Sequence, residues 1–142
     1  MGTQQALTTK QLEVLTLIYD IEEFGKKHGN VTGIKEILTQ DGYMQDEEFD
    51  KYYKVLVYYG YLSVEGNVTI DGKQYLDLFV EYLQEKEKHP DIVINNSFSL
   101  IDLENLNVGL NAFVNLKEVI GIGKGLAGLI KSVMQAMKNS KH

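Results

Sequence analysis

The sequence predicts a mainly α-helical domain with one short β-hairpin, followed by an amphipathic C-terminal helix. Three observations predict this class. Apolar residues recur at three- and four-residue spacing in several stretches before residue 90, which is the period of a helix with one buried face. Two β-like runs flank the turn residues Glu65-Gly66-Asn67. Near the end of the chain, a row of lysines lies opposite a row of large apolar residues.

The first two helices are predicted from capping residues and apolar spacing. Thr8 can cap a helix, with Gln11 completing a capping box, and the run is expected to stop near His28-Gly29. Its apolar positions are Leu12, Leu15, Ile18, Ile21 and Phe24. A short helix is expected over residues 31–38, with three apolar residues toward the core: Ile34, Ile37 and Leu38.

A third helix and a hairpin are predicted next. Residues 45–59 place apolar side chains on one helical face: Phe49, Tyr52, Tyr53, Leu56 and Val57. Gly60 is expected to end this helix, because glycine readily takes the left-handed conformation that closes a helix. The runs 61–64 and 68–70 are then expected to pair as a β-hairpin.

A fourth helix is expected to follow the hairpin directly. Asp71 is predicted to cap it, with Gln74 three residues later as the second member of a capping box. The helix should end before Pro90, because proline disfavours helical backbone at its own position and at the one before it. Its apolar stripe consists of Tyr75, Leu76, Phe79 and Leu83.

This order of elements resembles the winged-helix superfamily over residues 8–88. The resemblance rests on Tyr58-Tyr59-Gly60-Tyr61-Leu62 leading into Val68-Thr69-Ile70-Asp71-Gly72-Lys73-Gln74-Tyr75-Leu76. It implies a winged-helix domain over residues 8–90, in which the hairpin is the wing. It also implies either protein binding or transcription regulation, and dimerisation through a C-terminal helix, because winged helices serve both roles.

Residues 91–115 are predicted to connect this domain to the C-terminal helix. Ile92-Val93-Ile94 and Phe98-Ser99-Leu100 can form a second small hairpin around Asn95-Asn96, because asparagine tolerates tight turns. Residues 102–115 fit no clean period and are interpreted as a loop or a broken helix.

Residues 116–138 are predicted to form a strongly amphipathic helix. Four lysines stand seven residues apart on its polar side, while glycines within it each lower helix stability by roughly 1 kcal/mol relative to alanine. Its apolar face is therefore expected to be buried against a protein partner or a second copy; association with a membrane surface and packing on the acidic body are the alternatives. The candidate partner-binding residues are Ile122, Leu126, Leu129, Ile130, Val133, Met134 and Met137.

Charge and composition argue against one class of function, DNA binding. The net charge of −6 divides into +4 for residues 117–142 and −10 for residues 1–116, and all 14 basic residues are lysine, which lacks the planar fork that reads guanine. Four carboxylates begin the third helix, where a winged helix would meet DNA, so DNA binding is disfavoured. Nucleic-acid contact would have to come from Lys51, Lys54, Lys73 or the basic C-terminal tail.

The tyrosines near the end of the third helix have two possible roles. Exposed rings could stack on single-stranded bases, but only Lys51 and Lys54 would face the phosphates. Core packing, with some exposed rings forming a partner surface, is preferred. The tyrosines concerned are Tyr52, Tyr53, Tyr58, Tyr59 and Tyr61.

No residue pattern for catalysis, metal binding or cofactor binding is present. The three histidines are isolated, and the chain has no P-loop, nucleophile elbow or dinucleotide fingerprint. The chain lacks cysteine, a signal peptide and a long apolar run, so a cytoplasmic location is expected.

The sequence predicts a non-enzymatic winged-helix interaction module or adaptor that binds a protein or itself through its C-terminal helix, without a small-molecule substrate or cofactor. The alternative is a DNA-binding transcriptional regulator that dimerises through that helix.

Overall fold

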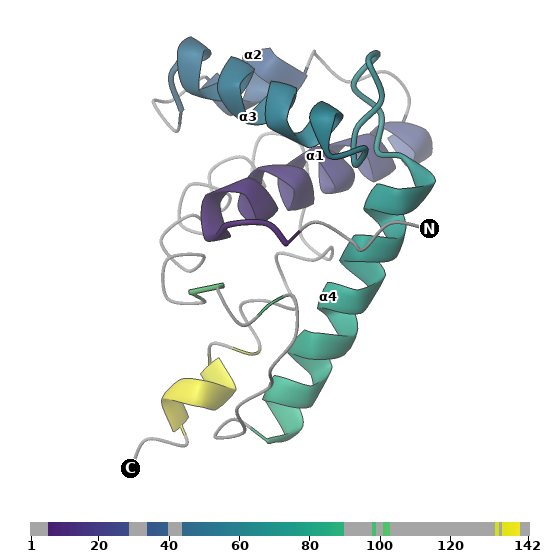
Figure 1. Ribbon diagram of the computed structural model, residues 1–142. Helices are drawn as coiled ribbons and strands as arrows, with labels where there is room; N and C mark the ends of the chain where they lie inside the picture. Colours follow the sequence, from purple (N-terminus) through teal and green to yellow (C-terminus); the bar gives the residue numbers. More distant parts are fainter. Residues whose placement is uncertain are drawn as a thin grey trace.

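Four helices form the main body of the chain. They are α1 (Thr9–His28), α2 (Ile34–Thr39), α3 (Asp46–Tyr58) and α4 (Ile70–Lys88). In Figure 1, α1 crosses the centre of the molecule, with α2 and α3 on one side and α4 running past it on the other. This computed structural model describes residues 6–28, 34–39, 44–89, 98, 101–102, 133 and 135–139, the last group being helical.

The helices begin where side chains can satisfy the first backbone amides. Thr8 Oγ1 accepts a hydrogen bond from the Gln11 amide at 3.3 Å, and the Thr8 amide donates to Gln11 Oε1 at 3.0 Å, as predicted. At the start of α4, the Gly72 amide donates to Thr69 Oγ1 at 3.0 Å. The capping residue of α4 is therefore Thr69, and the predicted cap, Asp71, lies inside the first helical turn.

The prediction of a β-hairpin wing is wrong, while the mainly α class fits the structure. Between α3 and α4, the described residues contain one isolated antiparallel bridge, Leu62 to Val68, and no strand. The physical reason lies at the second of the two predicted strands. The Thr69 amide donates to the Tyr61 carbonyl at 3.1 Å, but the Thr69 side chain caps α4 and Ile70 already belongs to that helix. Beyond Thr69 no extended residue continues the pairing, and the segment is a hydrogen-bonded loop.

Helix α1 is enclosed on all sides over much of its length. Every residue from Leu12 to Ile18 is buried, although the sequence predicted burial of one face. Two of these residues are polar and have partners: the Glu13 carboxylate lies 2.8 Å from Lys10 Nζ, and Thr16 Oγ1 donates to the Leu12 carbonyl at 2.8 Å. These contacts offset the cost of removing polar groups from water.

The predicted apolar faces of the helices account for about half of the buried core among the described residues. Leu12, Leu15, Ile18 and Ile21 of α1 are buried, as are the apolar stripe of α4 and Phe49 and Leu56 of α3. Leu38 is buried and Ile34 packs against the core, whereas the side chains of Phe24 and Ile37 lie outside the described part of the chain.

Residues after α4 complete this core. Phe98, Ile101 and Val133 are buried in the same cluster as the helices, and Met137 packs against it. The remaining residues of the predicted second hairpin lie outside the described residues. The domain boundaries predicted from the sequence stay a prediction.

Gly72 allows α4 to approach the backbone at Tyr61. A Cβ atom at position 72 would overlap the Tyr61 carbonyl oxygen and lie 2.9 Å from Val68 Cγ1. We expect Gly72→Ala to lower the free energy of unfolding by about 1–3 kcal/mol, despite the higher helix propensity of alanine. Urea denaturation measures this change. Gln74→Ala, at an exposed position of the same helix, is the control and should stay within about 0.5 kcal/mol of wild type; equal stability of both variants would contradict the close approach.

Candidate functional site

The loop between α3 and α4 is held in one shape by its own hydrogen bonds. Gly60 and Gly66 adopt φ angles of 85° and 94°, the left-handed region that glycine favours. The Ser63 amide donates to the Asn67 carbonyl at 2.8 Å, and the Asn67 amide donates back to Ser63 Oγ at 3.1 Å. These bonds close the loop around its tip.

Two further bonds fix the loop to the helices, and a third joins its two ends. From α1, Glu22 Oε1 accepts from the Val68 amide at 2.8 Å. From α3, Tyr53 Oη donates to the Val64 carbonyl at 2.7 Å, which anchors the tip. Thr69 Oγ1 donates to the Gly60 carbonyl at 2.6 Å and joins the two ends. The loop is therefore fixed at its base and its tip.

Large apolar side chains protrude from this loop and from the helix ends beside it. Tyr58 at the end of α3 is 86% exposed, Val64 near the loop tip is 78% exposed, and Ile70 at the start of α4 is 74% exposed. We call these three residues the loop surface. Exposed apolar side chains on a fixed backbone favour protein binding, because little conformational entropy remains to be lost on association.

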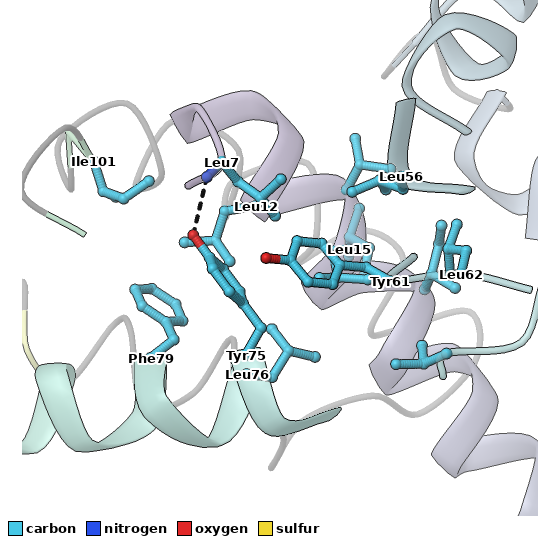
Figure 2. Packing of buried hydrophobic residues seen from close by; sticks show 14 of the residues in the cluster. Leu7, Leu12, Leu15, Leu56, Tyr61, Leu62, Tyr75, Leu76, Phe79 and Ile101 are labelled. Atoms are coloured by element: carbon cyan, nitrogen blue, oxygen red, sulfur yellow. Dashed lines mark hydrogen bonds between the residues drawn. The ribbon is translucent and has the colours of Figure 1, made fainter. Parts of the chain in front are cut away.

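Aromatic rings fill the other side of the loop, in the core. Tyr61 lies against Tyr75 of α4 with ring centroids 4.8 Å apart. Tyr75 Oη accepts a buried hydrogen bond from the Leu7 amide at 3.0 Å (Figure 2). Burial raises the pKa of Tyr75, while the hydrogen bond from Leu7 acts in the opposite direction, and burial also raises the pKa of Tyr82. Both phenols are thus neutral structural groups at physiological pH.

The structure places two of the predicted partner-binding residues in or against the chain's own core. Val133 is fully buried there, and Met137 packs against the core. Gln135, Lys138 and Asn139 are exposed, so this end of the predicted C-terminal helix has the expected polar and apolar sides. The other candidates lie outside the described residues: Ile122, Leu126, Leu129, Ile130 and Met134.

The candidate nucleic-acid lysines are spread over two helices. Lys51 and Lys54 are exposed on α3, and Lys73 is half-buried on α4. All four carboxylates at the start of α3 are exposed, and Asp50 Oδ1 lies 3.1 Å from Lys35 Nζ of α2. The hydrogen bond with Asp50 raises the pKa of Lys35. The exposed face at the start of α3 is consequently acidic.

No constellation for metal binding is formed among the side chains that the structure describes. They include no group of three or more histidine, cysteine, aspartate or glutamate residues that could hold a metal ion. His89 is exposed at the end of α4. Among the described helices, none has the length and apolar character needed to cross a membrane.

Comparisons with protein families, with characterised proteins and with solved structures found no match to this chain. The resemblance to the winged-helix superfamily therefore stays a prediction from the sequence.

Sequence reasoning missed two residues that shape the site. No pattern in the sequence singles out Glu22, yet it holds the loop at Val68. Thr69 was assigned to a strand, yet it caps α4 and also joins the loop ends. The sequence alone does not distinguish Thr69 from Asp71 as the cap of α4, because threonine and aspartate are both favoured at that position.

The hydrogen bond from Leu7 to Tyr75 gives a direct test of this arrangement. We expect Tyr75→Phe to lower the free energy of unfolding by about 1–3 kcal/mol, because the buried Leu7 amide would lose its acceptor. Tyr58→Phe removes the same hydroxyl from an exposed ring and should change stability by less than about 0.5 kcal/mol. Urea denaturation of both variants measures the difference, and equal effects would show that the buried bond does not form.

Proposed function

We propose that this chain is a non-enzymatic protein-interaction module whose loop surface binds a protein partner. The observation that carries the proposal is the exposure of Tyr58, Val64 and Ile70 on a backbone held by α1 and α3. A tyrosine in such a position suits a binding hot spot, because its ring supplies a large apolar area at low entropic cost.

Electrostatics support a protein partner over DNA. The start of α3, where a helix-turn-helix protein would enter the groove, exposes the carboxylates of Asp46, Glu47, Glu48 and Asp50. These charges suit the helix dipole but repel phosphate. The two exposed lysines of α3 stand behind them and lack the fork of arginine. Regulation of transcription through DNA contact is therefore the less favoured alternative.

The C-terminal helix predicted for residues 116–138 supplies a second region for association. Val133 contributes to the chain's own core and Met137 packs against it, so we propose that the remaining apolar residues of this helix contact a partner or a second copy. A homodimer formed in this way is compatible with a separate partner on the loop surface. We further propose a cytoplasmic location, because the chain contains no cysteine.

The double variant Tyr58→Ser with Val64→Ser tests the loop surface. Both side chains are exposed, so the free energy of unfolding should change by less than about 0.5 kcal/mol for each substitution. Binding to the protein partner captured by the wild-type chain from its native extract should weaken by about tenfold or more, measured by titration with the purified partner. The matched control, Gln74→Ser with Gln84→Ser on the exposed face of α4, should bind as wild type.

Two outcomes would contradict this proposal. One is a captured partner that binds the double variant and wild type equally, which would place binding elsewhere. The other is tight, salt-sensitive binding to bulk duplex DNA at low salt, because non-specific affinity of this kind is expected of a DNA-binding protein and not of a protein-interaction module.

A further inference from the structure

A short segment beyond α4 lies on an aromatic face of that helix. Phe98 is buried among three rings of α4, with centroid distances of 5.0 Å to Tyr75, 5.4 Å to Phe79 and 5.5 Å to Tyr82. These three residues follow the i, i+4, i+7 spacing that aligns side chains along one helical face. One side chain from outside the helix thus covers a continuous aromatic stripe.

Beyond Phe98, the described residues Ile101 and Asp102 are held by backbone hydrogen bonds. The Ile101 amide donates to the Phe98 carbonyl at 3.0 Å, which closes a turn, and the Ile101 side chain is buried. The Asp102 amide then donates to Thr9 Oγ1 at the start of α1, at 2.9 Å. An aromatic anchor, an aliphatic anchor and one main-chain bond are the contacts by which short peptides bind helical surfaces.

The elements that carry the receiving surface also have contacts outside this segment. Tyr75 is held by the Leu7 amide and by the ring of Tyr61, and Phe79 and Tyr82 lie on the same continuous helix. Thr9 belongs to α1, and the residues of that helix from Leu12 to Ile18 are buried in the core. Phe98, Ile101 and Asp102 thus contact helices that are also held by other residues.

We propose that the aromatic face of α4 is a peptide-binding site, and that the segment carrying Phe98, Ile101 and Asp102 is its ligand in cis. The chemical class of ligand is a turn-forming peptide with an aromatic residue followed, three positions later, by an aliphatic residue. Attachment to the same chain gives the cis segment a high effective concentration, so it occupies the site until a partner carrying the same motif competes. This site is distinct from the loop surface and does not rest on the function proposed for it.

Hydrogen exchange on the full chain tests the proposal at two amides. Those of Ile101 and Asp102 should exchange through local opening, at least tenfold faster than the amides of Leu76 and Phe79 in α4, because a docked segment can leave without unfolding the helix. A synthetic peptide of residues 94–105 at millimolar concentration should accelerate exchange at these two amides by competing for the site. The same peptide with alanine in place of the phenylalanine should have no effect.

A variant of α1 supplies a second readout. Thr9→Ala removes the acceptor of the Asp102 amide and should accelerate exchange at Asp102 about threefold or more, with α4 unchanged, whereas Thr9→Ser keeps the hydroxyl and should behave as wild type. The proposal is overturned if Ile101 and Asp102 exchange as slowly as the α4 amides and with the same denaturant dependence. It is also overturned if the peptide does not compete, because the segment would then be ordinary core.

Discussion

The enclosure of α1 is the constraint on which the rest of the structure depends. A helix buried from Leu12 to Ile18 requires protein around its whole circumference, and no single neighbouring helix can supply that. The core accordingly draws on α3, on α4, on the loop residues Tyr61 and Leu62, and on Val133, which lies far along the chain. Even the polar groups on α1 are satisfied within this enclosure, by Lys10 and by the Leu12 carbonyl.

The same helix gives the loop surface its rigidity. Glu22 of α1 bonds to the Val68 amide, and Tyr53 of α3 bonds to the Val64 carbonyl at the loop tip. These two bonds fix the loop relative to both helices. A fixed loop presents Tyr58, Val64 and Ile70 without paying much ordering entropy on binding. Packing at the centre of the molecule is in this way linked to the interaction proposed at its surface.

The sequence predicted what depends on local periodicity and missed what depends on tertiary contacts. The start of α1 followed from Thr8 and Gln11, and the end of α4 from the approach of Pro90, because caps and proline act locally. The hairpin was wrong because the choice between pairing and capping at Thr69 is decided by the contacts of α4. Burial of Glu13 on a second face of α1, and of Phe98 on α4, depends on neighbours distant in sequence, which periodicity cannot supply.

Substitution at the centre of α1 tests the account most directly. We expect Leu15→Ala to lower the free energy of unfolding by about 2–5 kcal/mol, because the fully enclosed site cannot collapse around the cavity. Leu78→Ala, at a partly exposed position of α4, should cost less than about 1 kcal/mol, and circular dichroism and tyrosine fluorescence should report one coincident transition for both variants. Equal effects of the two substitutions, or separate transitions for the two probes, would contradict a core organised around α1.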